Sequence, residues 1–407
     1  MAMVNGPGVV RPARGTRPAN RRDLIVAAAS ELFSRKGYAN VGMGEVAEAV
    51  AIGPSALYRH FRGKHGLLAE VVAGALQTLD DALATAPPRL DQVAAALANS
   101  VLAHRGVGVL WRRESRHLVD DERAAFRAQA RRINGRMAEF IGRARPELEP
   151  AQRDVLAWSA LSVANSVSFH SLSLPDPEFP DLLTDLVLRT LEASLPSLGT
   201  RREPGRQVPL AALSRREAIL TEATKLFAQH GFTGVSVEDI GAAVGIAGPS
   251  VYNHFDGKAD ILAAAILRGD EWLRMGMHQA LARAADERDA LDRILTSYSG
   301  FVFETPQLMQ TLLSETSHLP EAGRGRARAA QRAYIAEWVH LLGRVHPEWD
   351  PVGARVRVQA VQSMINDTAL TPHLRALPDI EAVSAAIGAQ VLGLRAAAPM
   401  RARQHPK

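Results

Sequence analysis

The chain repeats itself. Residues 21–72 and 215–266 align without a gap at an offset of 194, and 18 of the 52 aligned positions are identical. Farther along, the similarity continues at an offset of 201, where Asn165 corresponds to Asn366. The 407 residues are therefore two copies of one unit, and any fold for this chain must be built twice.

Helical periodicity runs through both copies. In the first, apolar residues over 24–33 recur at helical spacing, and Gly37 follows where a helix can end with a positive φ. Two shorter helices are predicted over about 43–50 and 54–61, followed by a longer one. The second copy repeats this order, with Gly231 in the place of Gly37. Because no segment alternates apolar and polar residues between turns as a strand would, the predicted fold class is all-α.

Composition and missing motifs exclude several classes of protein. The chain has no cysteine, which excludes a disulfide scaffold and a thiol nucleophile and fits a reducing cytosol. Residues 1–20 contain no apolar stretch like that of a secretory signal, and no run of about 18 apolar residues predicts a membrane span. No phosphate-binding loop, nucleophile elbow, dinucleotide fingerprint or zinc motif is present. We therefore expect a cytoplasmic protein that is not an enzyme, has no catalytic residue, metal or cofactor, and does not bind a membrane.

Three short helices with a tight turn before the third are typical of a helix-turn-helix. The pattern Tyr-x-His-Phe-x-x-Lys closes this region at residues 58–64 and again, in register, at residues 252–258. With the Ile, Phe, Gly and Val positions that precede it, the pattern resembles the N-terminal domain of the TetR family of bacterial transcriptional regulators. The rest of each copy has the length of that family's helical ligand-binding and dimerisation domain. Two such units in one chain resemble the family's minority tandem architecture.

The resemblance, the repeat and a Pro-, Gly- and Arg-rich stretch between the copies divide the chain into seven segments. We predict a basic N-terminal arm (1–19), a first helix-turn-helix domain, the first head (20–66), a first helical ligand-binding and dimerisation domain (67–195), a linker (196–213), a second helix-turn-helix domain, the second head (214–260), a second helical domain (261–398) and a tail (399–407).

The resemblance implies that both heads bind double-stranded operator DNA. The residues that it implicates are Ser55, Ala56, Tyr58, Arg59, His60 and Lys64 in the first head, and Ser236, Ser250, Tyr252, Asn253, His254 and Lys258 in the second. The Tyr, His and Lys side chains would contact phosphates, whereas the start of the third helix and the residue between Tyr and His would reach bases. The alternative is that the tyrosines pack inside the heads and the charges only solvate a surface.

The two heads differ in charge and in the residues that would read bases. The first carries seven basic and four acidic residues, a net of +3, whereas the second carries four and six, a net of −2. Arg59 favours guanine and its counterpart Asn253 favours adenine. We therefore predict an asymmetric operator, with more nonspecific affinity from the first head. The acidic second head leaves an alternative open: a helical ligand-binding or scaffolding protein whose DNA-binding surface has partly decayed, especially in the second copy.

Two local features also distinguish the copies. The first copy starts with a group of five arginines that has no acidic residue among them. This arm could enter the minor groove of DNA, or it could be a solubilising tail. The arginines are Arg11, Arg14, Arg17, Arg21 and Arg22. At the cap of the second helix, Ser236 and Asp239 have the spacing of a capping box, whereas the first copy has Gly42, which supplies no hydroxyl.

The helical domains are predicted to bind a small, largely apolar effector that releases a repressor from DNA. The candidate ligand-binding residues are Trp111, Arg113, His117, Asn165, His318 and Asn366. Arginines 105, 112, 113 and 116 would suit an anionic head group, as in an acyl-coenzyme A, a fatty acid or a sterol derivative. The alternative is a packed core with surface ion pairs, and for the two asparagines a satisfied buried amide.

One chain already holds the two units that a symmetric dimer of this family would combine. A linker of about 18 residues spans roughly 25 Å as a random coil, which lets the halves face each other. We therefore predict an intramolecular pseudo-dimer that works as a monomer, with a homodimer of the whole chain as the alternative.

Overall fold

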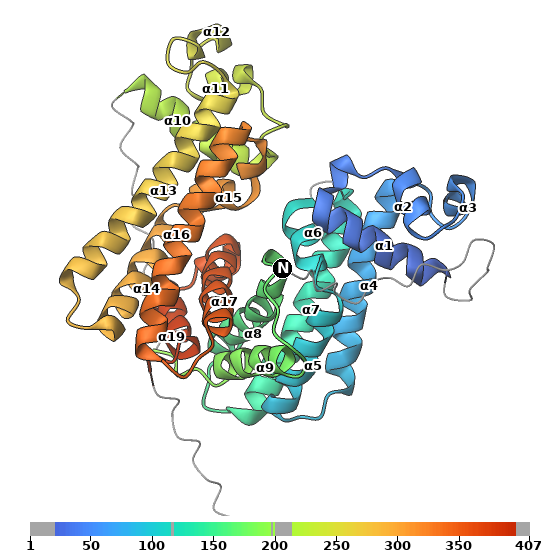
Figure 1. Cartoon of the computed structure of the whole chain (residues 1–407), viewed down its shortest axis with the longest axis vertical. Helices are drawn as coiled ribbons and strands as arrows, with labels where there is room; N and C mark the ends of the chain where they lie inside the picture. Colours follow the sequence, from blue (N-terminus) through green and yellow to red (C-terminus); the bar gives the residue numbers. More distant parts are fainter. Residues whose placement is uncertain (1–20, 115–117, 197, 200–213, 396–407) are drawn as a thin grey trace, which may run out of the picture. The chain divides into compact units, whose positions relative to one another are not determined.

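The computed structural model describes residues 21–114, 118–196, 198–199 and 214–395, and every regular element within those ranges is a helix (Figure 1). This confirms the all-α prediction. The predicted arm and tail lie outside the described residues, as does nearly all of the predicted linker. Among the described residues, no helix combines the length and the apolar character needed to cross a membrane.

The first copy begins with three short helices and continues into long ones. Its elements are α1 (Arg21–Lys36), the 3-10 turn η1 (Tyr38–Asn40), α2 (Met43–Ala49), α3 (Pro54–Tyr58), α4 (Lys64–Thr85), α5 (Leu90–Ala103), α6 (Val107–Glu114), α7 (Asp120–Ala144), α8 (Pro150–Asn165), η3 (Ser166–Phe169) and α9 (Glu178–Leu191). The third helix is three residues shorter than predicted, because Phe61 turns back into the core of the head and Gly63, with φ of 126°, redirects the chain into α4.

The second copy repeats this order. Its elements are α10 (Arg215–His230), α11 (Val237–Ala243), α12 (Gly248–Val251), α13 (Lys258–Arg283), α14 (Glu287–Glu304), α15 (Pro306–Ser314), η4 (Thr316–His318), α16 (Glu321–Val345), α17 (Pro351–Leu370), α18 (Pro372–Arg375) and α19 (Ile380–Val391). The turns after α1 and α10 place Gly37 at φ 83° and Gly231 at φ 73°, as the helix-ending glycines predicted.

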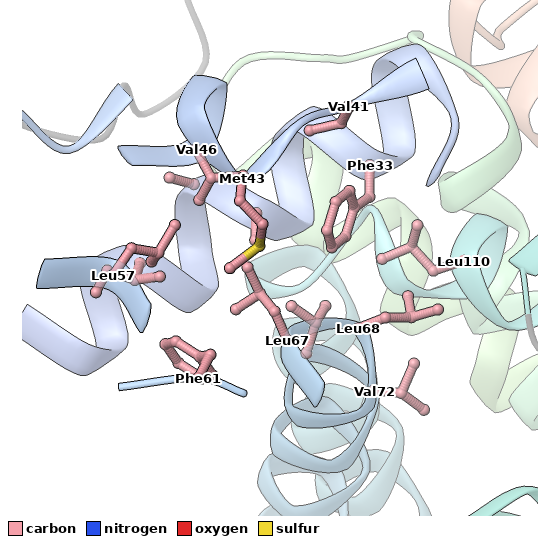
Figure 2. Close-up of a cluster of buried hydrophobic side chains, with 14 of the residues drawn as sticks. Phe33, Val41, Met43, Val46, Leu57, Phe61, Leu67, Leu68, Val72 and Leu110 are labelled. Carbon is pink, nitrogen blue, oxygen red and sulfur yellow. The ribbon is translucent and has the colours of Figure 1, made fainter. Parts of the chain in front are cut away.

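An apolar cluster holds the first head together (Figure 2). Phe33 of α1 packs with Leu57 of α3, with Phe61 in the turn after α3, and with Leu67 of α4. All four side chains are at most 4% exposed. The head therefore shares its core with the first turns of α4. Because α4 and α13 each run without a break out of a head, the predicted boundaries at residues 66 and 260 fall inside continuous helices.

The compact units of the chain do not follow the boundary between the two copies. Most of the first copy forms one unit, but the stretches 151–163 and 173–175 and the chain from residue 185 onward form the other. Much of α8 and the C-terminal part of α9 therefore fold with the second copy. The repeat could not indicate this division, because it depends on contacts between residues far apart in sequence.

Candidate nucleic-acid interface

The third helix of the first head exposes one face and buries the other. Leu57 is fully buried and Phe61 is 4% exposed, so both point into the head. Between them, Tyr58 is 56% exposed, and Arg59 and His60 are also exposed. Because a helix turns about 100° per residue, burying the first and fifth positions leaves those between them for solvent. At the start of the helix, Ser55 is exposed and Ala56 is half-buried.

The second head presents the same face. Val251 and Phe255 are buried, and Tyr252 is 56% exposed, the same fraction as Tyr58. Asn253 is exposed, and Ser250 and His254 are half-buried. The two tyrosines therefore lie on the surface, and the alternative in which they pack inside the heads does not describe this structure.

An arginine of the first helix fixes the end of each third helix. Arg22 donates from Nη1 to the carbonyl oxygen of His60 at 3.2 Å, and its guanidinium lies 4.7 Å from the centroid of the Phe61 ring. Arg216 makes the same two contacts, donating to the carbonyl of His254 and stacking 3.9 Å from the ring of Phe255. These contacts satisfy a carbonyl at the C-terminal end of a short helix, where no backbone partner remains.

This pair of arginines corrects one prediction and reveals residues that sequence reasoning missed. Arg22 was grouped with a free basic arm, yet it lies in α1 and also pairs with Glu70 of α4 at 3.0 Å. Arg21 also lies in α1, whereas the arginines at positions 11, 14 and 17 lie outside the described residues. The sequence held one sign of these contacts: arginine occupies the same position in both copies of the repeat, as Arg22 and Arg216.

The lysine that closes each motif packs against an aromatic ring. Lys64 Nζ lies 4.4 Å from the ring centroid of Tyr38, and Lys258 Nζ lies 4.4 Å from that of Phe232. Lys258 also donates to the carbonyl oxygens of Phe232 at 2.7 Å and Val235 at 2.6 Å. An ammonium has three N–H donors, so at most one of those on Lys258 is left for a phosphate.

The caps of the second helices differ as the sequence predicted. Ser236 accepts a hydrogen bond from the Asp239 N–H at 3.0 Å, and the Asp239 carboxylate accepts from the Ser236 N–H at 2.8 Å. The Ser236 hydroxyl also donates to this carboxylate at 2.6 Å, and this bond, together with the one from the Ser236 N–H, lowers the pKa of Asp239 below its ordinary value. In the first head, Gly42 caps α2 without a side-chain hydrogen bond. Ser236 is thus occupied with its own helix, and a phosphate contact from it stays a prediction.

A buried carboxylate joins the second head to the rest of its copy. Glu315, which is 1% exposed, accepts a hydrogen bond from the Phe232 N–H through Oε2 at 2.9 Å. His318 stacks on the Phe232 ring with centroids 5.2 Å apart and lies 3.6 Å from the same Glu315 oxygen. The structure therefore places His318 against the head, where it contacts Phe232, and a ligand contact from His318 stays a prediction.

Of the other predicted ligand-binding residues, the structure describes the side chains of the two asparagines. Asn366 is buried and accepts a hydrogen bond from the Tyr298 hydroxyl at 2.8 Å, so it is a satisfied buried amide. Asn165 is half-buried at the end of α8. Trp111 and Arg113 belong to α6, but their side chains, like the whole of His117, lie outside what the structure describes.

Arg105 does not offer its charge to a ligand. Its Nε donates to the carbonyl of Val167 at 2.6 Å, and its Nη2 donates to the carbonyls of His170 at 2.8 Å and Leu172 at 2.6 Å. The guanidinium also lies 5.2 Å from the Phe179 ring centroid. Arg105 therefore holds a backbone segment in place, and its predicted role as an anchor for an anionic head group is wrong.

Within the described residues, no group of three or more His, Asp or Glu side chains could hold a metal ion.

Comparison with known proteins gives the heads a family. Residues 25–71 and 219–265 each match the model of the bacterial regulatory proteins, tetR family. The chain is 28% identical over 107 residues to the HTH-type transcriptional activator FasR of Mycolicibacterium smegmatis, an alignment that covers 26% of this chain and 47% of that protein. It is 31% identical over 106 residues to the HTH-type transcriptional repressor KstR2 of Rhodococcus jostii, covering 26% and 52%. The chain thus spans about half the length of the curated relatives it matches.

Solved structures give weaker matches. The TetR family transcriptional regulator PfmR from Thermus thermophilus is 26% identical, with a TM-score of 0.39, and the match covers 44% of this chain and 97% of that one. A TetR-family transcriptional regulator from Bordetella parapertussis is 23% identical, with a TM-score of 0.37, covering 39% and 83%.

Proposed function

Since residues 25–71 and 219–265 belong to the tetR family of bacterial regulatory proteins, we propose that this chain is a transcriptional regulator that binds double-stranded operator DNA with two different heads. One observation carries the proposal. Both heads carry an exposed tyrosine and a histidine beside a third helix whose buried side and C-terminal end are held alike, while the residue between that tyrosine and histidine differs.

The first head combines phosphate contacts with a base contact. The exposed hydroxyl of Tyr58 and imidazole of His60 suit phosphate oxygens, which set the position of a protein on the duplex. Arg59, exposed between them, suits the O6 and N7 acceptors of guanine in the major groove. With its net charge of +3, this head supplies most of the salt-dependent, nonspecific affinity.

The second head makes a different base contact on a weaker electrostatic background. Asn253 takes the place of Arg59 and suits the N6 donor and N7 acceptor of adenine. The net charge of this head is −2, so its phosphate contacts must come from a few side chains such as Tyr252 and His254. An operator read by both heads is then asymmetric, with half-sites about 34–36 Å apart or a multiple of that distance.

An effector acts through the helical domains, and Glu315 gives the second domain a route to its head. The buried carboxylate follows α15 directly and holds the N–H of Phe232 in the turn before α11. Thr311 of α15 adds a hydrogen bond from Oγ1 to the Thr224 carbonyl of α10 at 3.3 Å. A displacement of α15 by a ligand would therefore shift the second head.

The effector that we propose is small and largely apolar. In the second helical domain, Tyr298 and Asn366 satisfy each other within a group that also contains Tyr334 and Trp338, with ring centroids 6.0 to 6.3 Å apart. Burial raises the pKa of Asp270 to about 6, so this carboxyl group repels an anionic ligand less than an ordinary aspartate would. A panel of acyl-coenzyme A, fatty acid, sterol and cationic compounds tests this class by thermal shift, since a ligand of the folded state raises the melting temperature. Stabilisation by cationic compounds alone would contradict it.

Repression, with release of DNA on effector binding, is part of the proposal. The two curated relatives carry the opposite words activator and repressor in their names, so kinship does not decide the sign of regulation. A reporter gene behind a selected operator, with and without the protein, measures that sign.

The chain acts as a pseudo-dimer within one molecule. This is supported by the second compact unit, which combines parts of α8 and α9 from the first copy with the helices of the second. Native mass spectrometry of the protein–DNA complex tests the arrangement together with DNA binding. One chain on each operator, bound with an affinity that falls steeply as salt rises, is the expected result. Two chains on every operator would support a homodimer of the whole chain.

A second candidate function is favoured by one observation. The second head is acidic, and its Lys258 is bound by two carbonyl groups of the protein itself. A protein in which this head no longer binds DNA would be a ligand-binding or scaffolding protein with one residual DNA contact. In a gel-shift titration, such a protein would show no preference for an operator with two half-sites over one with a single half-site.

A further inference from the structure

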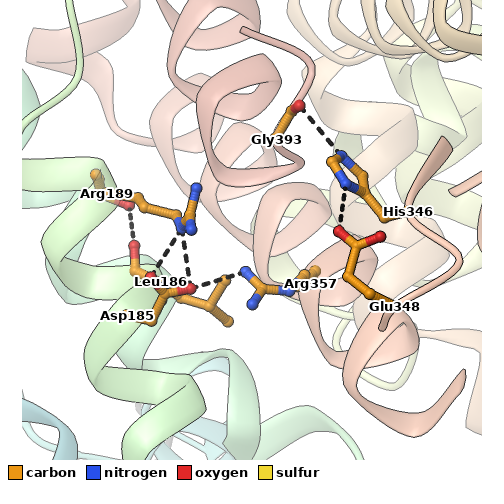
Figure 3. Close-up of polar contacts among 8 residues, drawn as sticks. Asp185, Leu186, Arg189, His346, Glu348, Arg357 and Gly393 are labelled. Atoms are coloured by element: carbon orange, nitrogen blue, oxygen red, sulfur yellow. Dashed lines mark hydrogen bonds and ion pairs between the residues drawn. The ribbon is translucent and has the colours of Figure 1, made fainter. Parts of the chain in front are cut away.

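Side chains from the two copies meet inside the second compact unit. Asp185 of α9, from the first copy, lies 3.0 Å from Arg357 of α17, from the second, measured between Oδ2 and Nη1 (Figure 3). In the same unit, the Gln390 side chain of α19 accepts a hydrogen bond from the Ser194 N–H at 3.2 Å. These contacts show which surfaces of the two copies pair with each other.

Arg357 is the most constrained member of this interface. It is only 8% exposed, and its guanidinium lies 4.0 Å from the ring centroid of Trp349. The Asp185 carboxylate also accepts hydrogen bonds from Nε of Arg189, one helical turn further along α9. The distances are 2.8 Å to Oδ1 and 2.9 Å to Oδ2. Because a guanidinium stays charged at any physiological pH, Arg357 cannot escape burial by losing a proton. Its charge must therefore have a partner wherever this surface is buried.

The repeat shows that this ion pair has no symmetric counterpart. At the offset of 201, Arg357 corresponds to Leu156, and Asp185 corresponds to Ala386. The register is secure, because the buried positions of α9 and α19 coincide at this offset, as Phe179 with Ile380 and Leu186 with Ile387 show. Both Leu156 and Ala386 are buried apolar residues. One pseudo-symmetric position is thus charged and the other is apolar.

This asymmetry makes the possible pairings unequal. In a two-fold symmetric interface each contact occurs twice, with the same residues exchanged. Pairing the second copy with another second copy would place Arg357 against Ala386 twice, leaving two buried guanidinium groups without a carboxylate. Pairing two first copies would place Asp185 against Leu156 twice. Only the pairing of a first copy with a second copy gives the buried arginine its partner.

A second contact between the copies also disfavours the pairing of two second copies. His373, which follows α17, lies 3.3 Å from Asp154 of α8 between Nε2 and Oδ2, and its ring meets that of Trp158 edge-on at 5.9 Å. The counterpart of Asp154 is Arg355. Two second copies would therefore bring His373 next to an arginine, which repels a protonated imidazole. This pair is half-exposed, so its contribution is smaller than that of Arg357.

We propose that the Asp185–Arg357 pair selects the partner of the second copy's pairing surface: it accepts the first copy of the same chain and rejects a second copy from another chain. The inference rests on the proposed pseudo-dimer. It explains why the first copy pairs with the second, so that each paired unit carries two different heads. Symmetric pairing of two like copies would join two identical heads.

The test uses the full chain and the residues that the repeat itself supplies. Asp185→Ala and Arg357→Leu each place the counterpart residue at one position, and the double variant makes the interface apolar on both sides. Thermal unfolding of the four proteins forms a double-mutant cycle. Asp185→Ala leaves Arg357 buried without a carboxylate, so we expect it to lower the melting temperature more than the double variant does. Effects that simply add would overturn the proposal.

Partner choice is measured by the mass of the particles over a wide range of concentration, using light scattering coupled to size exclusion. We expect the double variant to form two-chain particles at a concentration at least about tenfold lower than the wild-type chain. Arg189→Ala is the matched control, because it removes a contact of Asp185 within α9 and should leave association unchanged. Wild-type and double-variant chains that associate equally would contradict the proposal.

Two further measurements keep the outcome clear. If Asp185→Ala does not fold, Asp185→Asn removes the charge while keeping the shape of the side chain, and it enters the same cycle. Binding of the wild-type chain to operator DNA is measured separately. A chain that fails to bind DNA but shows the coupling and the change in association refutes the proposed function alone. A chain that binds DNA as a single molecule but shows neither effect refutes the role of the ion pair alone.

Discussion

The two heads share a scaffold and an exposed tyrosine, and they differ in net charge and in the residue that follows this tyrosine. Phe33 and Phe227 fill the same place in the two cores, and Arg22 and Arg216 hold the ends of the third helices in the same way. The net charge changes from +3 to −2 between them, and Arg59 is replaced by Asn253. The comparison shows that the positions that build a head and those proposed to contact phosphates are alike, whereas the net charge and the residue proposed to read a base differ.

The ion pairs that join each head to its long helix show how loosely surface chemistry is constrained. In the first copy Arg22 of α1 pairs with Glu70 of α4, and in the second Glu217 of α10 pairs with Arg268 of α13 at 2.8 Å. The hydrogen bond from Arg268 lowers the pKa of Glu217. The same two helices are thus linked with the charges exchanged, and either arrangement serves the scaffold.

The largest effect is expected in the shared cores. Phe33→Ala and Phe227→Ala each remove a fully buried ring, and we expect each to cost about 3–5 kcal/mol of stability. If the heads are built alike, the two costs should agree within about 1 kcal/mol. The effect on DNA should differ, because the first head carries most of the nonspecific affinity. Denaturant unfolding and a gel shift on the same samples measure both, and equal losses of DNA affinity would argue against unequal heads.

Base reading comes next. Arg59→Ala should cost about 1–3 kcal/mol at one half-site and relax the base preference there, while leaving the other half-site unchanged. Asn253→Ala should do the same at the opposite half-site. Competition binding with operators mutated in one half-site at a time separates the two. If Arg59→Ala lowered affinity uniformly for all sequences, Arg59 would be a phosphate contact.

The lysines sharpen the electrostatic comparison. Lys64→Ala should weaken all DNA binding and flatten the slope of log affinity against log salt by about one unit. Lys258→Ala should flatten this slope by less than one full unit, because two of its three N–H donors already bind the carbonyls of Phe232 and Val235. It should instead lower the stability of the second head. Anisotropy titrations at several salt concentrations measure the slopes, and an equal change for the two variants would show that Lys258 contacts phosphate fully.

The long helices α4 and α13, which leave the two heads, differ at the position of Asp270. It lies twelve residues into α13, where the equivalent position of α4 is Leu76. Burial raises the pKa of Asp270 to about 6, so the folded state holds its proton more tightly than the unfolded state. Stability from this group therefore increases as pH falls from about 6 towards 4, and Asp270→Leu should remove that dependence and add about 1 kcal/mol at neutral pH. Melting curves across this pH range check it, and an unchanged pH profile would contradict it.

The caps give the smallest difference. Ser236→Ala should cost about 1 kcal/mol, and Gly42→Ser should gain a few tenths, because Gly42 already has the extended backbone of a cap and open space around it. The lowered pKa of Asp239 means that its contribution is present at neutral pH and is lost as pH falls below the ordinary value. Circular dichroism melts of both variants at neutral and acidic pH measure these effects. A Gly42→Ser protein that loses stability would show that the cap of α2 differs from that of α11.

The heads could be predicted from sequence because their signals are local. The positions of Gly37 and Gly231, the short helices and the alternation of buried and exposed residues around Tyr58 all follow from spacing within about forty residues. The contacts of Arg22 and Arg216 could not be predicted, because each binds a backbone carbonyl 38 residues away, and a carbonyl leaves no mark in the sequence. The pairing of Asp185 with Arg357 spans 172 residues and depends on how the copies fold together.

The central claim is that one chain presents two different heads to one operator, and selection of binding sites from random DNA tests it most directly. The claim predicts an asymmetric consensus, with guanine preferred where Arg59 reads and adenine preferred where Asn253 reads, at centres about one helical turn apart or a multiple. A perfect palindrome, with both halves carrying the same preferred bases, would contradict it.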